Sequence, residues 1–169
     1  KALATQCVSN LRQLQFACLM YADDNRQVLA PPGDDFGTAW VSGWMSFLAD
    51  RASNYDTKLL KDAQYARFAP YPQNAGVYKC PADLSKTLVG GVLTPLMVRM
   101  RINQPFDCDR MFASCPGTWL PSSKYVVFRK YTDIPSPSFT YCLLDEHPDS
   151  INAGGFANQM VEAGDYGSI

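Results

Sequence analysis

The segment from residue 1 to residue 21 carries apolar side chains at helical spacing. On a helix that turns about 100° per residue, they share one stripe about 80° wide: Leu3, Cys7, Leu11, Leu14, Cys18 and Tyr21. From Lys1 to Gln13 the other faces are polar, whereas from Leu14 to Tyr21 they are apolar nearly all round. The pattern predicts a helix whose C-terminal half is enclosed by its own domain and whose N-terminal half projects. The plainer interpretation is an amphipathic core helix that frays at its start.

The two ends of this helix differ. Asp23, Asp24 and Asn25, followed by Pro31-Pro32-Gly33, end the apolar pattern. Lys1-Ala2-Leu3-Ala4 contains no N-cap residue ahead of the pattern, and the chain does not begin with Met. We therefore expect that the chain starts inside a helix, and that residues once preceded Lys1 and were removed.

The rest of the chain consists of short elements between turn residues, with Pro and Gly spread throughout. A second helix is predicted from a cap at Ser53, Asn54 or Asp56 to a stop at Pro70. Its apolar positions are Leu59, Leu60, Ala63, Tyr65, Ala66 and Phe68.

Three later segments have strand patterns. Val98, Met100 and Ile102 alternate with Arg99 and Arg101, which predicts one face toward the core and one toward water. Residues 125–128 and 139–144 are rich in β-branched and aromatic side chains, and a Pro- and Ser-containing link joins them. The order predicts one α+β domain over residues 1–169, with the helix in 1–25, the globular part in 26–169 and an antiparallel sheet on the helix.

Composition removes several classes of function. With 47% apolar and 12% aromatic residues and a net charge of -1, the chain is not intrinsically disordered. A sequence pI of about 5.7 provides no excess positive charge for nucleic acid, which we do not expect as a partner. The single histidine excludes sites built from two or three imidazoles. No stretch approaches the roughly 20 apolar residues that a bilayer requires.

The spacing of the cysteines limits which of them can form disulfides. Cys7 and Cys18 cannot bond each other, because eleven helical residues separate them by about 16 Å, so both are predicted to be packing residues. Cys108 and Cys115 bracket a short loop and are a candidate disulfide, which would place the domain outside the cytoplasm. C-x-x-C does not occur, so zinc-ribbon and thioredoxin-like sites lack support.

A dense polar cluster follows the apolar run at 141–144, and its candidate metal ligands are Asp145, Glu146, His147 and Asp149. Carboxylates alone would favour calcium, whereas participation of the imidazole would favour zinc or manganese. His147 held by a carboxylate could instead serve Ser150 as a base. The favoured interpretation is a tight turn whose side chains bond the backbone, with no cofactor and no enzymatic function.

Aromatic residues offer a further candidate surface. Trp40, Trp44 and Phe47 are spaced for one face of a short helix, and core packing is the favoured interpretation over a sugar or peptide platform.

Several segments of the sequence resemble one family. Cys7-Val8-Ser9-Asn10-Leu11-Arg12-Gln13-Leu14, continued by Met20-Tyr21-Ala22-Asp23-Asp24-Asn25, resembles the first helix of type II secretion pseudopilins and related type IV pilin-like proteins, just after its membrane-spanning part. Further similar segments lie at residues 40–45, 77–83, 127–130 and 144–152. The helix and Lys79-Cys80-Pro81-Ala82-Asp83 carry most of the similarity.

The resemblance implies a subunit made with a prepilin leader that is cleaved and methylated, and an apolar segment that anchors it in the inner membrane. The domain would face the periplasm or cell envelope. Its partners would be other pseudopilin subunits and the secretion or pilus assembly machinery. Some family members bind calcium in a C-terminal loop, but no ligands can be assigned here by similarity.

The preferred hypothesis is a non-enzymatic fibre subunit that assembles through its N-terminal helix. Leu3, Cys7 and Leu11 would contact neighbours or the edge of the domain itself, while Leu14, Cys18 and Tyr21 would hold helix and domain together. One alternative is an envelope-displayed binding module that contacts an exported substrate or glycan through Trp40, Trp44, Tyr71 and Tyr78. Another is a metal-dependent hydrolase centred on His147.

Overall fold

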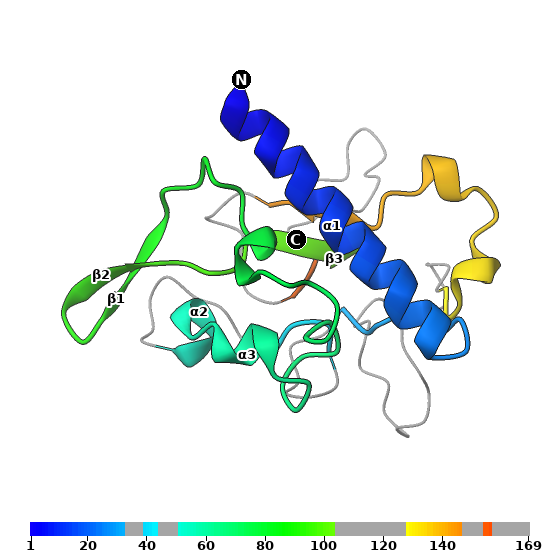
Figure 1. Ribbon diagram of the computed structural model, residues 1–169, viewed down its shortest axis with the longest axis horizontal. Coiled ribbons are helices and arrows are strands. Elements are labelled where there is room, and N and C mark those ends of the chain that lie inside the picture. The colour runs from blue at the N-terminus through cyan, green and yellow to red at the C-terminus, as the bar shows by residue number, and fades with distance from the viewer. Residues whose placement is uncertain (33–38, 44–50, 104–127, 147–153, 157–169) are drawn as a thin grey trace, which may run out of the picture.

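A long helix, α1 (Ala2–Asp24), lies across one side of a set of short helices and strands (Figure 1). This computed structural model describes residues 1–32, 39–43, 51–103, 128–146 and 154–156. The fold is α+β, because the helix is followed by short helical segments and by two small sheets, one a local hairpin and the other built from residues far apart in the sequence.

The C-terminal end of α1 lies where the sequence predicts it. Asn25 closes the helix: its backbone N–H bonds the carbonyl of Tyr21 at 3.0 Å, and its side-chain amide donates to the same oxygen at 2.7 Å. Arg26 and Gln27 then adopt positive φ angles of 56° and 71°, which turn the chain back toward the domain.

The three-stranded sheet has the order β4 (Leu143–Asp145), β3 (Met100–Asn103), β5 (Gly155–Phe156). β4 is antiparallel to β3, with Arg101 opposite Leu144, whereas β5 is parallel to β3. The sheet is therefore mixed, and the prediction of an antiparallel sheet holds for one of its two strand pairs.

The central strand β3 was predicted with one face in water, and this part of the prediction is wrong. Arg99, just before the strand, is 6% exposed, and Arg101 is fully buried. Both side chains find acidic partners within the fold, and an alternating pattern does not reveal such partners. Met100 and Ile102 lie in the core as predicted.

The single helix predicted after residue 53 is replaced by two short ones, α2 (Ala52–Tyr55) and α3 (Lys58–Lys61). The carboxylate of Asp56 accepts a bond from the backbone N–H of Lys58, and that of Asp62 accepts one from Gln64. Such local bonds compete with helical ones and break the segment into turns. The buried apolar residues are nevertheless among those predicted: Leu59, Leu60, Ala66 and Phe68.

A hairpin that the sequence analysis missed projects at one end of the molecule (Figure 1). β1 (Lys86–Val89) pairs with β2 (Val92–Pro95) in an antiparallel register. Gly90 and Gly91 connect them with φ angles of 54° and 83°, a conformation that glycine adopts without strain. A Gly-Gly pair between β-branched residues was the available signal.

The strand predicted over 139–144 is wrong in its first half. Residues Pro137–Phe139 form a 3₁₀ helix, η3, and the strand β4 begins only at Leu143. Pro137 fixes φ and has no N–H for a ladder, which favours the turn. Ahead of it lies a second 3₁₀ helix, η2 (Tyr131–Asp133). Of the strand predicted at 125–128, only Phe128 lies within the described residues.

Aromatic side chains build the core beneath α1. The ring of Trp40 is fully buried, with its centroid 5.5 Å from that of Phe68 and 5.8 Å from that of Tyr78. The indole N–H donates to the carbonyl of Gly154 at 2.9 Å, which satisfies its one polar group. The predicted core role of Trp40 is confirmed. Residues 39–43 are not helical, and Trp44 and Phe47 lie outside the described residues.

Candidate functional site

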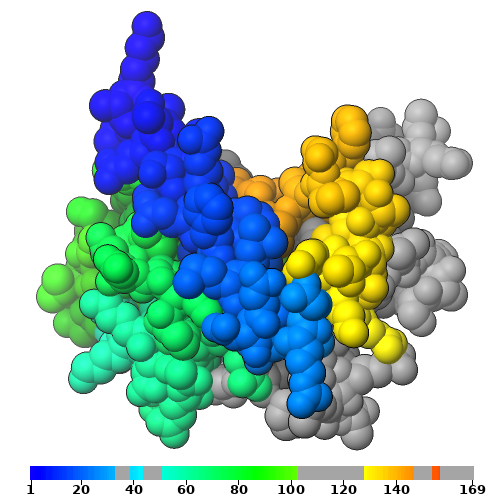
Figure 2. All heavy atoms as spheres, turned by 45° about the vertical axis from the view of Figure 1, so that its right-hand side comes forward, coloured from blue at the N-terminus to red at the C-terminus, as the bar shows by residue number. Residues whose placement is uncertain are grey.

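The N-terminal part of α1 extends beyond the domain. Every residue from Lys1 to Gln6 is exposed, and Leu3 is 52% exposed although it continues the stripe that packs on the core further along. Figure 2 shows this end of the helix standing clear of the remaining atoms. The predicted projection is therefore present.

The second half of α1 is covered on one side only. Phe16 is 63% exposed, Met20 51% and Leu19 39%. The prediction that this half is enclosed is wrong, because the domain packs against a single face of the helix. An apolar surface is left open, and Figure 2 shows the helix lying on the outside of the molecule.

The opposite face of α1 holds the helix to the domain. Leu14 is fully buried, and Cys18 and Tyr21 are 4% and 6% exposed, in the packing positions where the sequence placed them. Cys7 and Leu11, proposed from sequence as part of an assembly face, are partly buried against the same core. They contact the domain's own edge, the second of the two options that the sequence left open for them.

One polar residue on this face was missed by the sequence analysis. Asn10 was assigned to the polar side of α1, but it is 7% exposed. Its side-chain amide donates to the carbonyl oxygens of Lys79 at 2.8 Å and Gly76 at 3.3 Å. Gly76 lies within the 3₁₀ helix η1 (Ala75–Tyr78), and Lys79 directly follows it. Asn10 therefore links α1 to that segment.

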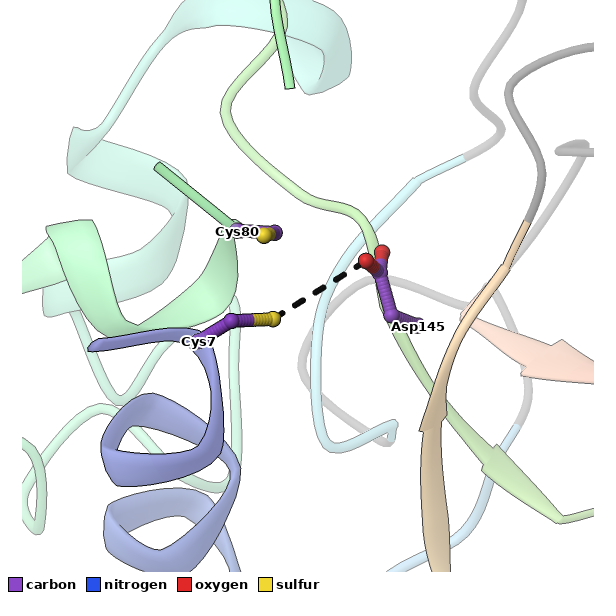
Figure 3. Close-up of side chains that lie close together, drawn as sticks. All are labelled: Cys7, Cys80 and Asp145. Atoms are coloured by element: carbon purple, nitrogen blue, oxygen red, sulfur yellow. Dashed lines mark hydrogen bonds between the residues drawn. The ribbon is translucent and has the colours of Figure 1, made fainter. Parts of the chain in front are cut away.

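Next to this link, three side chains converge from distant parts of the chain. Cys7 from α1, Cys80 after η1 and Asp145 from β4 bring their sulfur and oxygen atoms within 4.8 Å of one another. Figure 3 shows the two thiols side by side, with the Cys7 sulfur directed at the Asp145 carboxylate, 4.0 Å from its Oδ2. No sequence motif links these three residues, which lie 65 or more positions apart in the chain.

The thiol of Cys7 is a weak acid in this setting. Burial is the main cause, with further contributions from the hydrogen bond with Cys80 and from the charge of Asp145, and together they raise the pKa of Cys7 to about 12. The thiol therefore stays protonated at neutral pH and is a poor nucleophile.

Charged residues surround the cluster. The Arg99 guanidinium lies 2.7 Å from Asp83 and 3.7 Å from Asp145, and Lys79 approaches Asp83 at 3.2 Å. Burial acts to raise the pKa of Asp83, but the Ser85 hydrogen bonds and the two cations outweigh it, so the pKa is lowered. For Asp145 burial prevails over the attraction of Arg99, and its pKa is raised.

A second buried cation lies two residues after Arg99, on β3. Arg101 is fully buried, and burial lowers its pKa to about 10, although the Glu146 carboxylate at 3.4 Å opposes the shift. Arg99 also donates from Nε and Nη2 to the backbone carbonyl of Glu146. Both arginines thus fix the chain where β4 ends.

This arrangement bears on the predicted metal ligands. Asp145 and Glu146 each face an arginine, so a cation at either carboxylate would compete with a guanidinium. Cys7, Cys80 and Asp145 together offer two sulfur ligands and one oxygen, which is a donor set for zinc once both thiols are deprotonated. His147 and Asp149 lie outside the described residues, as do Cys108 and Cys115.

A groove runs between α1 and the segment that leads into β4. Its cavity volume is about 460 Å³, and Val8, Arg12, Tyr141 and Leu143 are among its lining residues. Val8 and Tyr141 are 49% and 46% exposed, so the groove adds to the open apolar surface of the helix.

The aromatic platform proposed for a binding module is mostly inaccessible among the described residues. Trp40 and Tyr78 are fully buried, and burial raises the pKa of Tyr78 well above its ordinary value. Tyr71 is half-buried and donates a hydrogen bond from its hydroxyl to Asp24 at 3.1 Å. The fourth member, Trp44, lies outside the described residues.

Comparison with family models, with curated proteins and with solved structures gave no match. Among the described residues, no helix combines the length and apolar character needed to cross a bilayer.

Proposed function

We propose that this chain is a non-enzymatic pilin-like subunit of a type II secretion or type IV pilus-like fibre, and that it assembles through α1. In this proposal the subunit is anchored in the inner membrane before assembly, and the domain described above faces the periplasm. The similarity of residues 7–14, 20–25 and 79–83 to pseudopilins supports the family.

The observation that carries the proposal is the open apolar surface of α1. Leu3 lies beyond the domain, and Phe16 and Met20 point away from it, all more than half exposed. Covering the half of each side chain that water still reaches would stabilise the assembly by roughly 1 kcal/mol per residue. Phe16, Leu19 and Met20 lie three and four positions apart, so they form one apolar patch on the outer side of the helix, whereas Leu3 is exposed separately where the helix extends beyond the domain. An exposed apolar patch marks a contact site, and a neighbouring helix would cover it.

The buried face of α1 supports the same proposal. Leu14, Cys18 and Tyr21 fix the helix to the domain, so a force or a contact at its exposed part is transmitted to the whole fold. In the proposed fibre the helix lies in the core, and the domain that it carries lies on the outside. No chemical step by the protein is needed for this role.

Photo-crosslinking in cells that produce the subunit from its own gene tests the proposal. With p-benzoylphenylalanine in place of Phe16, we expect a ladder of self-adducts on illumination. The matched control carries the same group in place of Leu84, which is 84% exposed but far from α1 in the sequence. Absence of self-adducts at Phe16, or equal ladders at both positions, would overturn the proposal.

A further inference from the structure

The cysteines of the described residues lie in two pairs. Sγ of Cys18 in α1 is 3.8 Å from Sγ of Cys142, which lies 124 positions further along the chain. Sγ of Cys7 and Sγ of Cys80 lie within 4.8 Å of each other. Each pair joins one residue of α1 to one residue of the domain.

We infer that this protein contains two disulfide bonds, Cys7–Cys80 and Cys18–Cys142, which fasten α1 to the domain. The structure shows all four of its described cysteines as free thiols, and the pairing uses each of them once. It is independent of the candidate bond between Cys108 and Cys115, which are the other two cysteines of the chain.

The surroundings hold the partners in place. Asn10, one turn from Cys7, bonds the carbonyl of Lys79, the neighbour of Cys80. Cys18 and Cys142 are 4% and 8% exposed in the core beneath α1, with their sulfurs in van der Waals contact. A disulfide needs about 2.05 Å between sulfurs, so the Cys18 and Cys142 sulfurs have to approach from 3.8 Å as the bond forms.

The local chemistry favours a structural role over a catalytic or metal-binding one. Thiolates are the form that attacks substrates and binds metals. Burial and the Cys80 contact raise the pKa of Cys7, and the hydrogen bond with Cys18 together with burial raises that of Cys142. The Arg99 guanidinium, 3.7 Å from Asp145, also opposes a cation at the Cys7 site.

Each bond forms by thiol–disulfide exchange while the chain folds, before the sulfurs are buried. One cysteine thiolate attacks a disulfide of an oxidant, such as a dithiol oxidase or oxidised glutathione, and a thiolate of the oxidant leaves. The second cysteine then attacks the mixed disulfide and releases the other oxidant thiol. Overall, two protein thiols lose two protons and two electrons, and the oxidant disulfide becomes two thiols.

The bonds have a mechanical consequence, which rests on the proposed function. A fibre subunit is pulled by its helix when it leaves the membrane and when the fibre is loaded. Covalent links at Cys7 and Cys18 would hold the domain to the helix near both ends of their contact. Packing alone would let α1 separate under load.

Peptide mapping tests the pairing, because trypsin places all six cysteines in different peptides. Arg12 separates Cys7 from Cys18, and cleavage sites isolate each of the others. The chain is refolded in a glutathione redox buffer, free thiols are blocked with N-ethylmaleimide, and the non-reduced digest is analysed by mass spectrometry. We expect the peptide 2–12 linked to 80–86, and 13–26 linked to 131–169.

Thermal unfolding provides a second readout. We expect dithiothreitol to lower the Tm of the oxidised protein by roughly 10 °C for each bond. The variant Cys18→Ala/Cys142→Ala should lose the contribution of its own pair and keep that of Cys7–Cys80. If this core variant does not fold, Cys7→Ala/Cys80→Ala makes the same comparison at the more exposed pair.

Three results would overturn the inference. They are blocked thiols at all four positions, links in any other combination, and a Tm unaffected by reduction. Zn²⁺ bound at the reduced thiols of Cys7 and Cys80 in the purified protein would overturn the Cys7–Cys80 bond and assign a metal site there instead. The outcome is separate from that of the fibre proposal, because linked peptides in purified protein do not depend on self-adducts at Phe16.

Discussion

The side-chain amide of Asn10 donates to the backbone carbonyl of Lys79 over 2.8 Å, and this bond fixes the position of α1 on the domain. It is formed by a residue on the packing face of the helix, between Cys7 and Leu14. The amide also donates to the carbonyl of Gly76, which accepts a second bond from the backbone N–H of Lys79, so one side chain joins α1 to two backbone acceptors.

Replacement of Asn10 is therefore expected to destabilise the fold. Asn10→Ala leaves the Lys79 carbonyl without this donor and leaves the Gly76 carbonyl with the longer bond from the N–H of Lys79, which should lower the free energy of unfolding by about 1 to 3 kcal/mol. Urea denaturation followed by circular dichroism measures this. Gln13→Ala, at an exposed position of the same helix, is the control and should change stability by no more than about 0.5 kcal/mol. Equal losses in both variants would show that Asn10 does not hold the helix.

The two ends of α1 should respond differently to a charge. Leu14→Asp places a carboxylate at a fully buried position and should prevent folding. Leu3→Asp changes a side chain that is 52% exposed and should leave the isolated fold within about 0.5 kcal/mol of the parent. Thermal unfolding of the two variants distinguishes these outcomes, and equal melting would contradict the described position of the helix.

The exposed face of α1 should matter for assembly and not for folding. Phe16→Glu is expected to keep the Tm of the parent, because Phe16 is 63% exposed, and to abolish fibre formation in cells. The control is Leu88→Glu in the hairpin, where the side chain is 57% exposed. Electron microscopy of sheared fibres provides the measurement. Normal fibres from Phe16→Glu would argue against α1 as the contact surface.

Acid should weaken the fold through Asp83. The pKa of this carboxyl is lowered in the folded state, so its ionised form stabilises the protein above the pKa of the unfolded chain, near 3.8. That stability is lost as the pH falls from there through the lower folded value. Asp145 has the opposite sign: its raised pKa means that folding loses stability as the pH rises from about 3.8 through its folded pKa.

Asp83→Asn separates the two contributions. It leaves the buried Arg99 without its closest carboxylate and should cost about 3 kcal/mol at neutral pH. It should also remove the part of the acid-induced loss that occurs below pH 4. Denaturant titrations at pH 7 and pH 3 measure both effects, with the exposed Asp23→Asn as control. An unchanged loss of stability between these pH values in Asp83→Asn would assign it to other groups.

Periodicity alone was sufficient for α1 and for much of the core. The stripe through Leu14, Cys18 and Tyr21 and the stop at Asn25 appear in the structure, because helical spacing and a helix-ending residue are local properties. The same reasoning failed at 53–68, where Asp56 and Asp62 capture backbone donors and interrupt the helix.

The candidate site could not be predicted in the same way. Cys7, Cys80 and Asp145 lie far apart in the sequence, and only the packing of α1 beside η1 and β4 brings them together. Likewise, Arg101 fits a solvent-exposed position by alternation, yet it is fully buried, with the Glu146 carboxylate 3.4 Å from its Nε. A pattern of apolar and polar residues does not encode which charges will meet.

The sequence by itself determined where the long helix runs, which of its residues form the packing stripe, and the α+β class, since these follow from short-range spacing and turn chemistry. The tertiary structure decided which faces of that helix are covered. It also decided which cysteine lies beside which, and which carboxylates neutralise the arginines. These depend on contacts between distant segments, whose free energy is gained only when the whole chain has folded.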